Sequence, residues 1–190
     1  MEIVHYPHPS LRWKSKPIRE INAKLRETVS RMFELMYEAK GVGLAANQVA
    51  LPWRLFIMNP IGEANSPDNE FVFINPEITK RKGSVEGEEG CLSLPEVFGQ
   101  VRRAEEIVVQ AYDLKGQPFE MTLDDLPGRV VQHETDHLDG IMFPERMTET
   151  ARREIEADIS EFVQIFKHRQ ELGEIPSDQE LEAELKKLEP

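Results

Sequence analysis

The segment His133-Glu134-Thr135-Asp136-His137 carries the clearest chemistry in the sequence. On a helix, histidines at this spacing project from the same face, so both imidazoles can bind one metal ion. Glu134 lies between them, and its carboxylate can reach a water molecule on that metal without being a ligand. The segment therefore predicts a metal site with Glu134 as general acid and base. The alternative is a chance pattern in a glutamate-rich chain.

A catalytic site of this kind usually has three protein ligands and an open position for water. The candidate third ligand is Cys91, the only cysteine, which lies in Glu89-Gly90-Cys91-Leu92-Ser93-Leu94-Pro95. A thiolate binds Fe(II), Zn(II) and Co(II) strongly, and the neighbouring glycine and proline mark a strand end that can face a cleft. A buried, inert thiol is the alternative. The need for a third ligand favours coordination.

A third segment, Gly41-Val42-Gly43-Leu44-Ala45-Ala46-Asn47-Gln48, is rich in small residues. Small residues let the backbone approach a substrate closely. The side-chain amide of Gln48 can donate a hydrogen bond to a developing oxyanion. The alternative is a helix end followed by an ordinary surface loop.

The elements that must position these segments are short. Apolar residues fall on one helical face between about residues 22 and 40, and further helices are predicted near 126–138 and 150–170. Strand-like runs occur at 53–58, 71–74, 107–112 and 118–123, the last two forming a hairpin. The order lacks the alternation typical of doubly wound sheets. We therefore expect an α+β fold: antiparallel or mixed sheets around a central helix carrying the histidines, with an N-terminal and a C-terminal helix.

Composition narrows the possible partners. The 190 residues include 23 basic and 35 acidic side chains, for a net charge of −12, which disfavours broad binding to DNA or to anionic lipid. We see no membrane-spanning run and no signal or transit pattern, so we expect a cytoplasmic protein. A single catalytic domain is predicted over 1–170. Residues 171–190 form an acidic extension, either a short helix or disordered, and a solvated tail is the favoured interpretation.

Together, the segments G-V-G-L-A-A-N-Q, E-G-C-L-S-L-P and Q-H-E-T-D-H-L-D-G resemble the three motifs of the peptide deformylases, in the same order. The resemblance extends over roughly residues 3–167. It implies that Cys91, His133 and His137 hold one divalent metal with water as fourth ligand. Fe(II) is the first choice, with Zn, Ni or Co as alternatives. The implied reaction removes the N-formyl group from the initiator methionine of new polypeptides and releases formate.

The resemblance also implies roles for the neighbouring residues. Metal-bound hydroxide attacks the formyl carbon, and Glu134 takes the water proton and passes it to the leaving amine. The oxyanion is held by the metal, the Gln48 side chain and the backbone N–H of Leu92. Glu89 and Arg103 either pair to fix the metal loop or remain two solvated charges.

The peptide itself is expected to lie extended beside Gly43–Leu44 and Gly90, exchanging main-chain hydrogen bonds. The methionine side chain needs an apolar pocket, which Leu126 and Val130 suit. Arg129 fits such a pocket only if its stem lines the wall and its head reaches solvent.

Other functions fit less well. A zinc endopeptidase would need a downstream third ligand instead of Cys91, and a purely structural metal site would need neither Glu134 nor Gln48.

In some bacterial deformylases a basic C-terminal helix docks on the ribosome. Here the C-terminal helix keeps some basic side chains, which the acidic extension opposes: Arg152, Arg153, Lys167 and Arg169.

Overall fold

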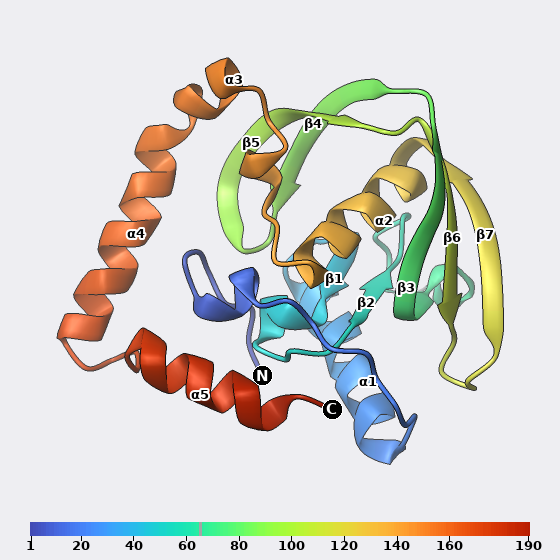
Figure 1. The fold of residues 1–190 in the computed structure, drawn as a ribbon, viewed down its shortest axis with the longest axis horizontal. Coiled ribbons are helices and arrows are strands. Elements are labelled where there is room, and N and C mark those ends of the chain that lie inside the picture. Colours follow the sequence, from blue (N-terminus) through green and yellow to red (C-terminus); the bar gives the residue numbers. More distant parts are fainter. Residues whose placement is uncertain (65) are drawn as a thin grey trace.

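Helix α2 (Asp125–Leu138) lies between two antiparallel sheets in the computed structural model, which describes residues 1–64 and 66–190 (Figure 1). The larger sheet has the order β1 (Gly43–Ala45), β2 (Leu55–Met58), β3 (Phe71–Lys82), β6 (Glu106–Tyr112) and β7 (Pro118–Asp124). The smaller sheet pairs β4 (Val85–Cys91) with β5 (Leu94–Arg103). Every neighbouring pair is antiparallel, so the α+β class predicted from the sequence is confirmed.

The N-terminal helix α1 (Ala23–Glu38) covers one face of the larger sheet. Its N-cap is Asn22, whose side chain accepts a hydrogen bond from the Leu25 backbone N–H at 3.0 Å. The predicted apolar face is buried in a core that it shares with β1 and β2. This packing fixes the loop after α1, which leads directly into β1.

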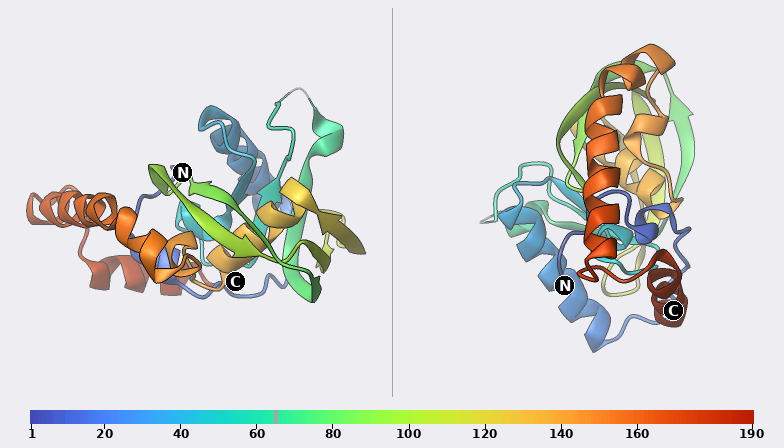
Figure 2. Two further views of the ribbon diagram at one scale, coloured as in Figure 1. Left: turned by 90° about the horizontal axis from the view of Figure 1, so that it is seen from above. Right: turned by 90° about the vertical axis from the view of Figure 1, so that its left-hand side faces the viewer.

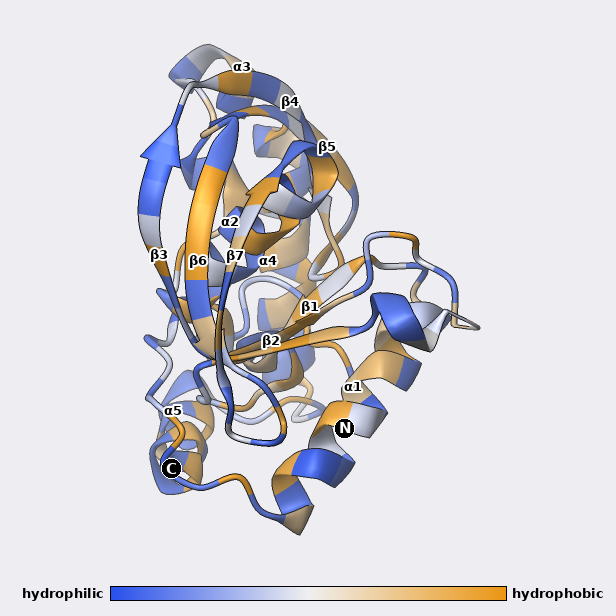
Figure 3. Ribbon diagram, turned by 90° about the vertical axis from the view of Figure 1, so that its right-hand side faces the viewer, coloured by the Kyte–Doolittle hydropathy of each residue, from blue (hydrophilic) through white to orange (hydrophobic). Residues whose placement is uncertain are grey.

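The other half of the larger sheet packs on α2. Figure 3 shows apolar bands along β2 and β6, and the buried side chains there include Phe56, Ile107 and Val109. Val130 and Val131 of α2 belong to the same core. The core therefore holds α2 rigidly enough to act as a platform for its two histidines.

The C-terminal helix predicted near 150–170 is two helices, α3 (Glu149–Glu154) and α4 (Glu156–Glu171). The break falls at Ile155, whose backbone leaves the helical region while its side chain enters the core beneath β5. The break between the two helices thus coincides with the burial of this side chain, which is 8% exposed.

The acidic segment beyond α4 contains a docked helix, α5 (Asp178–Leu188). Ser177 and Glu180 form the capping box at its start, and Leu185 is only 2% exposed. The indole N–H of Trp53 donates to the carbonyl of Leu188 at 2.8 Å. Figure 2 shows α4 and α5 along the side of the molecule that carries the N-terminal residues. None of the helices in the described ranges is long and apolar enough to cross a bilayer.

Candidate metal centre and active site

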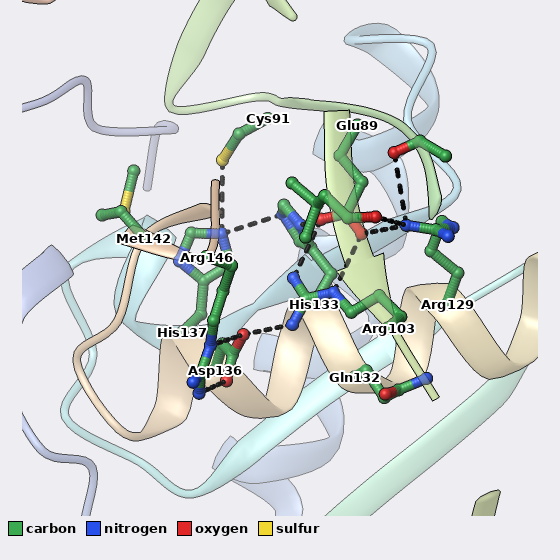
Figure 4. A network of polar contacts seen from close by, with 12 residues as sticks. Glu89, Cys91, Arg103, Arg129, Gln132, His133, Asp136, His137, Met142 and Arg146 are labelled. Carbon is green, nitrogen blue, oxygen red and sulfur yellow. Dashed lines mark hydrogen bonds and ion pairs between the residues drawn. The ribbon is translucent and has the colours of Figure 1, made fainter. Parts of the chain in front are cut away.

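Three potential ligand atoms converge where the two sheets meet α2 (Figure 4). The Nε2 atom of His137 lies 3.2 Å from Cys91 Sγ and 3.2 Å from His133 Nε2, and the three atoms lie within 4.8 Å of one another. Two nitrogens bound tetrahedrally to one metal ion lie about 3.3 Å apart, so the spacing fits a shared ion. One sulfur and two imidazoles suit a divalent first-row transition metal.

Two elements present these ligands. His133 and His137 lie one turn apart on α2, as their spacing predicted. Cys91 is the last residue of β4, at the point where the register of the β4–β5 ladder shifts. The metal centre thus joins the helix to the smaller sheet.

Glu89 orients one of the ligands. Its Oε2 lies 3.0 Å from Nδ1 of His133, and a proton on Nδ1 leaves Nε2 free for a metal. The Glu89 carboxylate also receives both N–H groups of the Arg103 fork at 2.9 Å, so the Glu89–Arg103 pair forms and is buried. Burial opposes ionisation, but hydrogen bonds from Arg103 and His133 hold the pKa of Glu89 well below its usual range.

The guanidinium of Arg129 is hydrogen-bonded to the smaller sheet, a contact that the sequence did not predict. It donates to Glu89 Oε1 at 2.7 Å and to the Val101 carbonyl at 3.1 Å, and the side chain is 15% exposed. Because these acceptors lie on β4 and β5, Arg129 fastens the smaller sheet to α2. Nothing local in the sequence signals this contact.

A second carboxylate extends the network away from the metal. Asp136 accepts a hydrogen bond from Arg103, and its two oxygens also bind Arg146 at 2.6 and 3.0 Å. Arg103 therefore bridges a carboxylate on β4 and one on α2. Figure 4 shows this continuous chain of contacts.

Burial also sets the protonation of the histidines. Desolvation, reinforced by the charge on His133, holds the pKa of His137 well below its ordinary value, so the ring is neutral, as a metal ligand must be. Burial acts in the same direction on His133, but hydrogen bonds to Cys91 and Glu89 outweigh it and raise its pKa, so this ring must give up a proton when it binds a metal. The two rings therefore differ in basicity although they share one helix.

Glu134 points into the cavity beside the ligands and is 4% exposed. Its Oε2 is buried and has no hydrogen-bond partner among the described residues. Burial raises the pKa of Glu134 to about 7, the range in which a general base is most effective at neutral pH. A free, desolvated carboxylate oxygen in this position can accept a proton.

Gln48 lies in the short turn η2 (Ala46–Val49), and its amide is held in one orientation. The side-chain oxygen accepts the Ala45 backbone N–H at 2.8 Å. The side-chain NH2 faces Cys91 Sγ at 3.4 Å and Ser93 Oγ at 3.3 Å. Leu92 lies in the turn between β4 and β5 and lines the same cavity.

The site opens into a cavity of about 830 Å³. Most residues expected to contact substrate line it: Gly43, Gly90, Leu126, Arg129 and Val130. Leu44 does not, because its side chain is fully buried in the core between α1 and the sheet. A Cβ atom added at Gly43 would lie 2.6 Å from Glu134 Oε1, so only glycine leaves that carboxylate in place.

Several lining residues were not anticipated from the sequence. Glu2, Ile3 and His5 of the N-terminal segment and Phe98 of β5 also form the cavity wall. They carry no motif, and their position depends on packing between distant parts of the chain.

Comparison with known proteins agrees with this geometry. A family model described as polypeptide deformylase matches residues 1–153. The peptide deformylase of Rhodopirellula baltica is 45% identical over 175 residues, which is 92% of this chain and 87% of the relative. That of Acidobacterium capsulatum is 47% identical over 150 residues, 79% of this chain and 88% of the relative. A crystal structure of peptide deformylase from Plasmodium falciparum matches with a TM-score of 0.85 and 34% identity, covering 88% of this chain and 98% of the other. The chain therefore belongs to the peptide deformylase family.

Proposed function

We propose that this enzyme hydrolyses the N-formyl group of the initiator methionine in new polypeptides, with Glu134 as the group that moves the proton. The observation that carries the proposal is the buried, unpartnered Oε2 of Glu134 beside the Cys91, His133 and His137 cluster. A zinc endopeptidase or a structural metal site is less consistent, since the third ligand is Cys91 and a structural site needs no free carboxylate.

Cys91, His133 and His137 would hold the divalent metal. When bound, the ion would lower the pKa of its water molecule and polarise the formyl oxygen. Fe(II) is our first choice, and Zn, Ni and Co suit the same thiolate and imidazole donors. Elemental analysis of protein purified without oxygen identifies the ion.

Glu134 would handle the proton throughout the reaction. Its Oε2 accepts a proton from the attacking water as the oxygen–carbon bond forms. The same proton passes to the nitrogen of the methionine as the carbon–nitrogen bond breaks, and the formic acid formed loses the second water proton to solvent and leaves as formate. A carboxylate with a pKa of about 7 suits both steps, because it neither holds nor releases the proton too strongly.

The developing negative charge on the formyl oxygen needs fixed donors. The Gln48 NH2 group is held beside Cys91 by the hydrogen bond that its own oxygen receives from Ala45. We assign this NH2 group and the Leu92 backbone N–H to the oxyanion. Fixed donors stabilise such charge without reorganisation, and losing one typically costs on the order of 100-fold in rate.

The peptide would bind as an added strand along β1. This strand is at the edge of the larger sheet, and Gly43 leaves room for the backbone of a ligand. Leu126 and Val130 would contact the methionine side chain, with the stem of Arg129 as part of the wall. The main-chain groups of Leu44 and Gly90 would flank the peptide.

One assay tests the proposal. Anaerobically prepared enzyme loaded with Fe(II), Co(II) or Ni(II) is incubated with formyl-Met-Ala-Ser, and formate release is followed. Absence of formate with all three metals would refute the proposed reaction. Cleavage of unformylated peptides would favour the endopeptidase.

Two finer points belong to the same proposal. The relatives include a bacterial enzyme and an Arabidopsis thaliana enzyme named chloroplastic/mitochondrial, and we assign this enzyme to the bacterial-type cytoplasm.

The exposed basic side chains Arg152 and Arg153 of α3 suit contact with ribosomal RNA phosphates. Sedimentation with ribosomes at low salt, lost in an Arg152→Glu/Arg153→Glu variant, is expected; a protein that never sediments contradicts the contact.

A further inference from the structure

The N-terminal arm, residues 2–8, is held against the turns that carry the proposed oxyanion donors. The Val4 backbone N–H donates to the Gln48 carbonyl at 2.9 Å, and the Tyr6 N–H donates to the Ser93 carbonyl at 2.9 Å. Figure 1 shows the arm between α4 and the turn that joins β4 to β5. The arm is thus part of the active-site wall, although it lies far from the motifs in sequence.

The side chains of the arm face two ways. Val4 and Tyr6 pack into the apolar cluster that also contains Cys91 and Leu94. Glu2, Ile3 and His5 line the cavity instead. From Ile3 to Tyr6 the two directions alternate as in an extended segment, and these residues therefore join the cavity wall to the apolar cluster.

Helix α4 packs on the other side of the arm. The ring of Phe162 meets the ring of His5 edge-on, with 6.4 Å between centroids, and Phe166 meets His8 in the same way at 6.2 Å. Both spacings lie within the range of attractive aromatic pairs. Phe162 also packs on the cluster that holds Val4 and Tyr6, so it contacts the arm at the point where His5 enters the cavity wall.

We infer that Phe162 is a positioning residue for the substrate cavity, acting through His5 on the part of the formyl-peptide beyond the methionine. The inference rests on the proposed placement of the peptide in this cavity. We assigned the reacting centre and the methionine pocket to residues of α2, of the β4–β5 turn and of η2, and assigned no side chain of the arm to either. Glu2, Ile3 and His5 would therefore contact the peptide residues that follow the methionine. An extended peptide advances about 3.3 Å per residue, so a hexapeptide reaches about 13 Å further along the cavity than a dipeptide.

Kinetics on substrates of two lengths test this role. KM and kcat are measured for formyl-Met-Ala and for a formyl-Met hexapeptide with the wild type, Phe162→Ala, His5→Ala and the double variant. Phe162→Ala is expected to raise KM for the hexapeptide about two- to tenfold, which corresponds to the free energy of one aromatic pair. The value of kcat, and KM for the dipeptide, should stay within about twofold of the wild type. In the double variant the rise should not exceed that of His5→Ala alone, because Phe162 acts through His5.

Ile165→Ala is the matched control. Ile165 lies on the same helix, is 52% exposed and belongs neither to the cluster that holds Val4 and Tyr6 nor to the described cavity lining, so its removal should leave both substrates unaffected. If Phe162→Ala does not fold, Phe162→Leu keeps much of the apolar volume, removes the ring edge and carries the same expectation. An equal KM rise on both substrates, no rise on either, or an additive double variant would overturn the inference. Failure of the wild type to act on formyl-Met-Ala would instead count against the proposed function.

Discussion

The carboxylate of Glu89 on β4 lies 3.0 Å from Nδ1 of His133 on α2, which ties one metal ligand to the strand that ends in another, Cys91. We expect Glu89→Gln to weaken metal binding about 10- to 100-fold, because the amide no longer favours the Nδ1–H form of the ring. Competition with a chelator measures the affinity. Glu86→Gln, an exposed position on the same strand, is the control and should bind metal like the wild type.

The same carboxylate should affect stability against acid. Its pKa lies well below the usual glutamate value in the folded protein, so the stabilisation is complete above about pH 4.3, the value expected when unfolded, and is lost as the pH falls from there toward the folded pKa. Urea unfolding of the metal-free protein between pH 7 and 3 shows the loss. Glu89→Gln should be less stable at neutral pH and should depend less on pH; an equally steep dependence would assign the loss to other groups.

Replacing Glu134 by glutamine should separate metal binding from turnover. We expect metal content to stay near the wild-type value, while formate release falls by at least about 100-fold, because the glutamine amide cannot accept a proton as the carboxylate does. Elemental analysis and initial rates on one preparation give both quantities. Substantial activity in the variant would remove Glu134 from the proton transfer.

Gly43→Ala tests whether Glu134 can act only if residue 43 of β1 has no side chain. The added methyl would lie 2.6 Å from Glu134 Oε1 and 2.8 Å from Val130 Cγ1, so the carboxylate must move. We expect a large fall in kcat with little change in metal affinity, since the ligands are untouched. A variant with wild-type kcat would show that Glu134 tolerates the displacement.

Helix α5 should contribute to stability through Leu185. Removing this buried side chain as Leu185→Ala is expected to lower the free energy of unfolding by about 2–4 kcal/mol. Trp13 donates its indole N–H to the Glu189 carboxylate and Trp53 donates to the Leu188 carbonyl, so tryptophan emission should shift to longer wavelength if α5 undocks. Leu172→Ala, at a side chain that is 60% exposed, should change neither quantity appreciably.

Much of the metal centre follows from sequence because its determinants are local. The histidine spacing requires only that residues 133–137 form a helix, and the capping box at Ser177 and Glu180 is equally local. The pairing of Cys91 with the histidines needed one further argument, the number of ligands that such a metal requires.

What escaped prediction depends on contacts between distant segments. The strands β4 and β5 have no continuous apolar run, because their exposed faces carry glutamates and arginines and the buried positions are few. The direction of the Arg129 side chain is set by carbonyl groups on those strands. The role of the N-terminal arm as a cavity wall likewise depends on α4, from the opposite end of the chain.

The position of β1 at the border of its sheet has a consequence for self-association. An open sheet edge invites pairing with another copy of the same protein and is a common start of aggregation. Here the edge strand is three residues long, all three residues are buried, and one of them, Gly43, lines the substrate cavity. So short and buried an edge offers little backbone for pairing with the edge of a second folded molecule. The strand proposed to bind the extended peptide is thus poorly suited to pairing between two copies of the enzyme.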